Sequence, residues 1–247
     1  MQRKHTEKSV RQAIKAASNN VEVYMDIQKI LDDNDLVVME AAIVESLRRS
    51  GEVTLHPRLE NALLIYDETG KRALCNLYRR YIDIARNYAI PMAICTPTWR
   101  ANRERISEAH IIDDLNSDAV NFLKHIRKKW GDWSANIFIG GLIGCKNDCY
   151  KPHEGLSIHG ARTFHSWQIN QLAGAGVDFL LGATLPAVPE ATGIPLAMAV
   201  WLLLLSLSSY EVCLRIMVVS ELNRAPVFSP VNASPFHCWR SRHDSEP

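Results

Sequence analysis

Four apolar segments of this sequence are each followed by polar or glycine residues that could take part in chemistry. Residues 40–45, 96–100, 140–148 and 184–186 supply in turn a carboxylate, hydroxyls with an arginine, glycines and a threonine. Arg100 can hold a carboxylate through two parallel hydrogen bonds, and a glycine such as Gly144 lets the backbone approach a ligand closely. In a parallel α/β barrel, ligands bind where the loops after the strands meet. These segments therefore predict a ligand site if the apolar segments are parallel strands.

The elements that would position these residues follow a βα pattern. Short apolar segments at 36–44, 90–98, 136–144 and 177–185 alternate with longer segments of helical period, which favours a parallel sheet. Apolar residues at three- and four-residue steps predict helices over 68–89, 119–130 and 157–173. Asn116 or Ser117 is the expected N-cap of the second helix, and Ser157 that of the third. We therefore expect an α/β fold with about four βα units.

The amino-acid composition excludes some classes of function but does not select one. The chain has 47% hydrophobic residues, enough for a sizeable core, and 28 basic against 27 acidic residues, so a nucleic-acid partner is not expected. The polar, cationic first twenty residues lack the apolar core of a secretory signal, which predicts a cytoplasmic protein. The six cysteines are scattered, so we expect free thiols and not disulfides.

We divide the chain into a helical lead-in (1–34), a (β/α) domain (35–199) and a divergent tail (200–247). The tail loses the βα alternation and is rich in Pro, Ser, Arg and His, which predicts a disordered or frame-shifted segment. Residues 191–210 contain no charge and reach the length of a membrane span. Gly193, Pro195 and the Ser-rich end of that segment argue against a membrane tether, which stays an alternative.

Four collinear motifs resemble the homocysteine S-methyltransferase family. They read VVMEAAIVESLRRSG, TPTWRAN, IFIGGLIGCKNDCY and VDFLLGATLPAVPEATGI, each at a successive strand end. The resemblance implies a (β/α)8 TIM-barrel type of fold. It is incomplete here, because about four βα units are recognisable in roughly 165 residues whereas a whole barrel needs about 250. The resemblance also implies methyl transfer from S-methylmethionine, S-adenosylmethionine or betaine to the thiol of homocysteine, giving methionine. In the family, a zinc ion held by three cysteine thiolates binds the substrate sulfur.

The resemblance assigns substrate contacts at each strand end. The first acidic position of the family matches Glu40, which is expected to hold the amino group of homocysteine, unless backbone N–H groups at the barrel mouth satisfy it. The remaining expected contacts are Thr96, Thr98, Trp99, Arg100, Gly141, Gly144 and Thr184.

Two departures from the family weaken the expected chemistry. Ala183 stands where most members have a glutamate, and Glu190 is interpreted as a helix-start carboxylate and not its replacement. The family's Asn-Cys motif and adjacent Cys-Cys pair are also missing, since Cys213 and Cys238 lie in different contexts. Zinc is therefore expected to be absent or substoichiometric.

One other metal site is conceivable. Cys145, Cys149 and His153 recur every four residues, but structural zinc sites usually have four ligands. A loop with two free thiols is the expected arrangement.

The leading hypothesis is thus a homocysteine S-methyltransferase-like protein whose activity is impaired. Its partners would be homocysteine and a methyl donor. The alternatives are a non-catalytic binding or structural remnant of the same fold and a membrane-tethered protein. An open half barrel would also expose strand edges, so self-association is expected. The abrupt change after Ala199 favours a frame shift over gradual degeneration.

Overall fold

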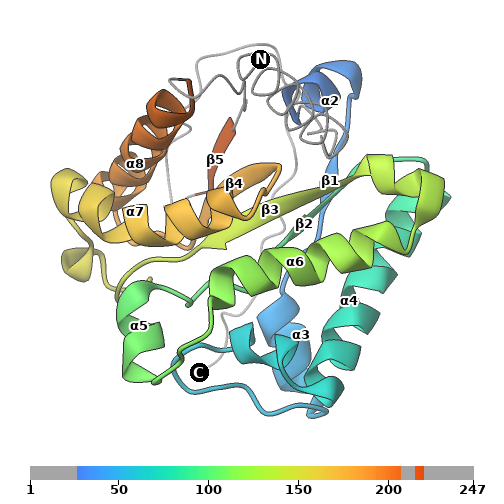
Figure 1. Ribbon diagram of the computed structural model, residues 1–247, viewed down its shortest axis with the longest axis horizontal. Coiled ribbons are helices and arrows are strands. Elements are labelled where there is room, and N and C mark those ends of the chain that lie inside the picture. The colour runs from blue at the N-terminus through green and yellow to red at the C-terminus, as the bar shows by residue number, and fades with distance from the viewer. Residues whose placement is uncertain (1–26, 207–214, 220–247) are drawn as a thin grey trace, which may run out of the picture.

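The computed structural model describes residues 27–206 and 215–219. Within them, strands alternate with helices along most of the chain, with short helices in some of the connections (Figure 1). The strands are β1 (Val38–Met39), β2 (Met92–Cys95), β3 (Ile137–Ile143), β4 (Phe179–Ala183) and β5 (Arg215–Val219). The α-helices are α2 (Ile27–Asp33), α3 (Ile43–Ser50), α4 (Glu68–Asn87), α5 (Arg103–Glu108), α6 (Leu115–Lys128), α7 (Ile158–Gly174) and α8 (Val188–Ser206). Three 3₁₀ helices span Ala62–Ile65, Gly131–Asn136 and Pro152–Glu154.

The strands form one parallel sheet in the order β1-β2-β3-β4-β5. Every residue of β2 is buried, which explains why this segment is continuously apolar and does not alternate. Sequence order equals spatial order, as it does around a (β/α) barrel. The predicted α/β fold of the incomplete (β/α)8 TIM-barrel type is confirmed.

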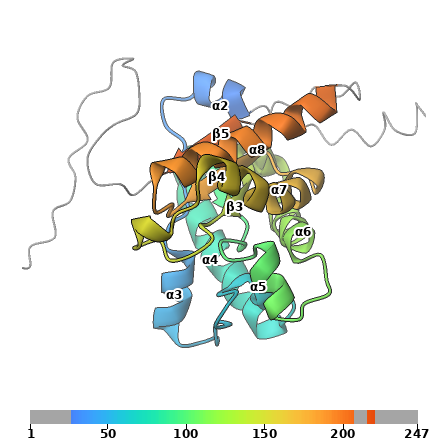
Figure 2. The ribbon, with the colours of Figure 1, turned by 90° about the vertical axis from the view of Figure 1, so that its left-hand side faces the viewer.

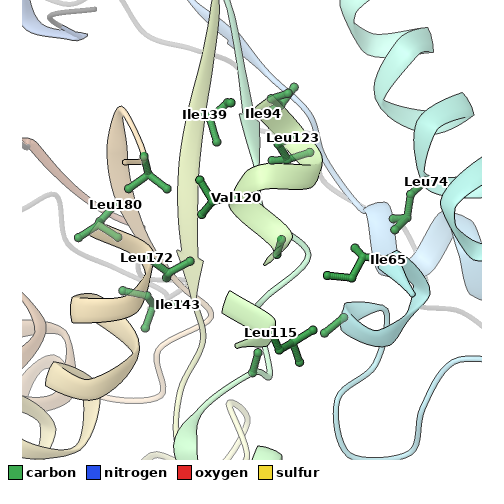
Figure 3. Packing of buried hydrophobic residues seen from close by; sticks show 14 of the residues in the cluster. Ile65, Leu74, Ile94, Leu115, Val120, Leu123, Ile139, Ile143, Leu172 and Leu180 are labelled. Atoms are coloured by element: carbon green, nitrogen blue, oxygen red, sulfur yellow. The ribbon is translucent and has the colours of Figure 1, made fainter. Parts of the chain in front are cut away.

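The two faces of the sheet pack against different groups. Ile94, Ile139 and Leu180 point to the helical layer, where they meet Leu123 and Leu172 (Figure 3). The alternate strand residues form a second cluster on the other face: Ala93, Cys95, Phe138, Phe179 and Leu181, with Ile30 of α2 against them. Within the helical layer, α7 and α8 lie side by side (Figures 1 and 2).

Helix boundaries agree with the sequence in two cases and differ in one. The helix predicted over 68–89 is α4, and Ser157 caps α7 by accepting a hydrogen bond from the Gly160 N–H at 3.1 Å. The N-cap predicted for α6 is wrong, because Asp114 caps that helix. Asn116 is instead buried and donates to the Ala101 carbonyl at 3.1 Å.

The first strand is shorter than predicted. The segment 36–44 was expected to be extended, whereas only Val38–Met39 pair with β2. Ala42 has a positive φ of 53°, which turns the chain into α3 directly after Glu40. Glu40 therefore directly follows the last residue of β1, Met39.

The structure describes only parts of the predicted lead-in (1–34) and of the predicted tail (200–247). Most of the predicted lead-in helix, 1–26, lies outside the described residues, and α2 is the part that is seen. Strand β5 falls in the predicted tail and pairs with β4, and α8 crosses the predicted boundary at residue 199. The three-part division and the self-association stay predictions, with β1 and β5 as the two sheet edges.

No helix among the described residues has the length and apolar character needed to span a bilayer.

Candidate functional site

A cavity of about 500 Å³ lies at the carboxyl ends of β1, β2 and β4. Its polar lining includes Glu40, Thr96, Trp99, Thr184 and Tyr150, and its apolar lining includes Met39, Ile43, Val44, Leu142 and Leu181. Parallel strands that end together bring residues far apart in sequence to one place. Of the predicted site residues, this cavity is lined by Glu40, Thr96, Trp99 and Thr184, and their role toward a substrate stays a prediction.

Glu40 is a buried carboxylate with one oxygen in use. Its side chain follows β1, and Oε1 accepts a hydrogen bond from the Cys95 N–H at 2.8 Å. Oε2 is buried and has no hydrogen-bond partner among the described residues. Burial raises the pKa of Glu40 to about 8, although the Cys95 N–H works in the opposite direction. The protein therefore satisfies one oxygen of this carboxylate and leaves the other without a partner among the described residues, in a side chain that lines the cavity.

Thr96 and Thr98 join the ends of β2 and β3. Thr98 donates its hydroxyl proton to the Leu142 carbonyl at 2.7 Å, and the Leu142 N–H donates to Thr96 Oγ1 at 3.0 Å. The two hydroxyl oxygens are 2.6 Å apart. Since the Thr98 proton is already used, Thr96 must be the donor between them. Both hydroxyl protons are thus held inside the protein, and these residues position the loop that carries Trp99.

Trp99 connects the loop after β2 to the ends of β3 and β4. Its indole Nε1–H donates to Thr184 Oγ1 at 2.6 Å, and its carbonyl accepts from the Gly144 N–H at 3.0 Å. A Cβ at Gly144 would lie 2.4 Å from the Trp99 carbonyl oxygen, so glycine is needed there. The close approach that the sequence assigned to a ligand is made by the Trp99 backbone.

Arg100 and Gly141 are not brought to the cavity. Arg100 lies 4.2 Å from the centre of the Trp99 ring and donates to the Asn147 carbonyl at 2.8 Å, so it anchors the loop after β3. Gly141 was expected to contact the substrate, whereas β3 continues past it to Ile143 and Gly141 faces the helical layer. A Cβ there would lie 2.7 Å from Leu180. Packing against the helices explains this glycine.

Sequence reasoning missed how Tyr78 and Glu190 contribute. Tyr78 lies on the helix that the sequence predicts over 68–89, and its hydroxyl donates to the carbonyl of Cys95, whose N–H is bound by Glu40, at 2.7 Å. Glu190 is fully buried on α8, where it was interpreted as a helix-start carboxylate. It accepts hydrogen bonds from the Lys146 and Leu156 N–H groups and from His165, each at 3.0 Å. The signal for it is that Glu190 is the single charged residue of an otherwise apolar helix.

The described residues do not fit a metal ion. Within 27–206 and 215–219, no three His, Cys, Asp or Glu side chains are close enough to hold one. The Cys145 thiol donates to the Asn147 carbonyl at 3.2 Å, and the His153 side chain is 79% exposed. Cys213 and Cys238 lie outside the described residues.

Comparison with known proteins gives a family and a fold. A family model described as Homocysteine S-methyltransferase matches residues 37–219. Crystal structures of the homocysteine methyltransferase MmuM from Escherichia coli, in metallated and oxidized forms, each superpose with a TM-score of 0.57 and 17% sequence identity. The match covers 71% of this chain and 63% and 62% of those chains, so this chain spans less than two thirds of their length. No curated protein sequence matches.

Proposed function

The chain belongs to the homocysteine S-methyltransferase family, and from this membership we propose that its cavity binds the amino acid homocysteine for methyl transfer to the thiol. The observation that carries the proposal is the buried Oε2 of Glu40, which lacks a partner among the described residues and belongs to a side chain that lines the cavity. Buried polar atoms are nearly always satisfied, so an unpartnered one at a cavity favours a ligand that donates. An α-ammonium group supplies that donor.

The protonation state of Glu40 fits a cationic donor. With a pKa of about 8, the side chain of the empty protein is mostly protonated at pH 7. An ammonium group close to Oε2 favours the ionised form, so binding releases the Glu40 proton to solvent. The apolar lining from Leu142 and Leu181 suits the aliphatic part of the amino acid. In this proposal the methyl donor is S-methylmethionine, S-adenosylmethionine or betaine.

Calorimetric titration with L-homocysteine and with L-methionine, which has no titrating thiol, tests the binding. We expect Glu40→Gln to weaken the affinity for both amino acids by about tenfold or more, because it removes the negative charge that would pair with the ammonium group. Glu45→Gln is the matched control, since Glu45 also lines the cavity but is paired with Arg48 and Arg49 at 2.7 and 2.8 Å. Equal affinities for wild type and Glu40→Gln, or no binding by wild type, would reject the proposal.

We further propose that this chain, purified without a partner, does not form methionine. A homocysteine thiol with a pKa near that of cysteine, about 8.5, is only slightly ionised at neutral pH. The family activates it with three cysteine thiolates, and no two cysteines of this sequence are adjacent. Metal analysis beside a methionine-forming assay with all three donors tests this. One zinc per chain together with turnover would contradict it, whereas binding without turnover would leave a non-catalytic binding protein.

A further inference from the structure

The loop that joins β3 to α7, residues 144–157, forms part of the cavity wall through Tyr150. This loop has a helix of only three residues, Pro152–Glu154. Its tip reaches solvent, with Tyr150 84% exposed. A long, mostly irregular loop needs anchors from elsewhere if it is to keep one position beside the cavity.

Glu190 supplies anchors at both ends of this loop. Oε1 accepts from the N–H of Lys146, near the start of the loop, and Oε2 accepts from the N–H of Leu156, near its end, both at 3.0 Å. His165 Nε2 lies 3.0 Å from Oε1 and donates the third hydrogen bond, because an ionised carboxylate can only accept. The Glu190 and His165 side chains are both fully buried. One side chain thus ties two loop positions ten residues apart to the helical layer.

The charge state of Glu190 suits this role. Burial alone would raise the pKa of Glu190, but the hydrogen bonds from His165, Leu156 and Lys146 lower it below its usual value. A carboxylate can satisfy all three donors, whereas an amide presents one acceptor and one donor group. We call Glu190 and its three donors, the Lys146 N–H, the Leu156 N–H and His165, the Glu190 clamp. This clamp requires glutamate and is not reproduced by glutamine, its closest isostere.

We propose that Glu190 is a positioning residue that holds the β3–α7 loop, and with it Tyr150, at the mouth of the cavity. Its effect on ligand affinity rests on the proposed function, but its effect on the loop does not. Glu190→Gln leaves a loop N–H facing an amide NH₂ group, so one end of the loop loses its acceptor. The loop should then open more often and uncover the cavity.

Two measurements on the full chain test the clamp without any ligand. Hydrogen exchange followed by mass spectrometry reports on residues 145–157, and the rate at which iodoacetamide labels Cys95 reports on access to the cavity, which Cys95 lines. Peptide mapping separates Cys95 from the other thiols. We expect Glu190→Gln to raise both rates about tenfold, the size of effect that one lost buried hydrogen bond gives.

Asp178→Asn is the matched control. Asp178 is also a buried carboxylate that accepts from a backbone N–H, that of Ile139 at 2.7 Å, but it precedes β4 at the opposite end of the sheet. We expect this variant to lose stability and to leave Cys95 labelling unchanged. If Glu190→Gln does not fold, His165→Leu removes one of the three donors and should raise both rates by a smaller factor.

The outcomes separate the two proposals. Faster exchange and faster Cys95 labelling in folded Glu190→Gln, with wild type failing to bind L-methionine, would support the clamp and reject the proposed function. Unchanged Cys95 labelling in that variant, with or without faster loop exchange, would overturn the clamp. The same would follow if Asp178→Asn opened the cavity equally.

Discussion

The two ends of the parallel sheet treat their buried carboxylates differently. At the amino end, Asp178 accepts from the Ile139 N–H and from Arg127, both at 2.7 Å. At the carboxyl end, Glu40 has one oxygen without a partner among the described residues, and the cavity lies beside it. Burial raises the pKa of both carboxyl groups, but Arg127 opposes the rise at Asp178. A satisfied carboxylate contributes to stability, and an unsatisfied one marks a place for a ligand.

The largest expected loss of stability concerns the buried carboxylate at the amino end of the sheet. Arg127→Met leaves the Asp178 charge buried without its partner, and breaking a buried pair in this way costs about 3–5 kcal/mol. The cost should shrink as the pH falls and Asp178 becomes protonated. Urea unfolding at pH 7 and pH 4 measures both. Arg86→Met, which removes an exposed arginine near the Trp130 ring, should cost less than about 1 kcal/mol.

At the carboxyl end, the expected effect is a pH dependence of stability. The pKa of Glu40 rises from 4.5 to about 8 on folding. The contribution of Glu40 to the free energy of unfolding is therefore fully present below pH 4.5 and is lost as the pH rises through 8. Between pH 6 and pH 8 the loss should be about 2 kcal/mol. The difference in unfolding free energy between wild type and Glu40→Gln measures it. A difference that does not change over this range would show that Glu40 is not held in an unsolvated environment.

Sequence pattern predicted the parallel strands and the end at which polar residues gather, because buried strands and strand-end loops have local signatures. It could not predict which of these residues face the cavity. Arg100 binds the loop after β3, and Gly141 packs against the helical layer. Both placements depend on where β3 ends and how α7 packs, which the sequence pattern does not show. Glu190 was missed as a clamp because its partners, Lys146 and Leu156, are backbone groups distant in sequence.

Two glycine-to-alanine variants test whether close contact with the Trp99 backbone fixes the structure at the carboxyl end of the sheet. A Cβ at Gly144 would lie 2.4 Å from the Trp99 carbonyl, whereas at Gly174 nothing lies within 4 Å. Gly144→Ala should therefore cost about 1–2 kcal/mol and weaken amino acid binding, because it displaces Trp99. Gly174→Ala should change stability by less than about 0.5 kcal/mol, as substitutions away from such contacts do. Thermal unfolding compares them, and equal losses would contradict the close contact at Gly144.

The smallest expected effect concerns the hydrogen bond between Trp99 and Thr184, which links the loops after β2 and β4 across the cavity. Trp99→Phe removes the donor of the 2.6 Å bond and keeps an aromatic ring, so the loss should be about 1 kcal/mol. Thr184 is half-buried and its hydroxyl also donates to the Ala183 carbonyl at 2.7 Å, so water can replace the lost donor in part.

A double-mutant cycle with Thr184→Ala isolates the bond, since each single variant removes it without removing the other side chain's packing. A coupling energy of about 1 kcal/mol is expected from unfolding of the four proteins. Strictly additive losses would mean that the two loops are positioned independently, in which case Gly144 and the Thr96–Thr98 contacts alone would fix Trp99 at the cavity.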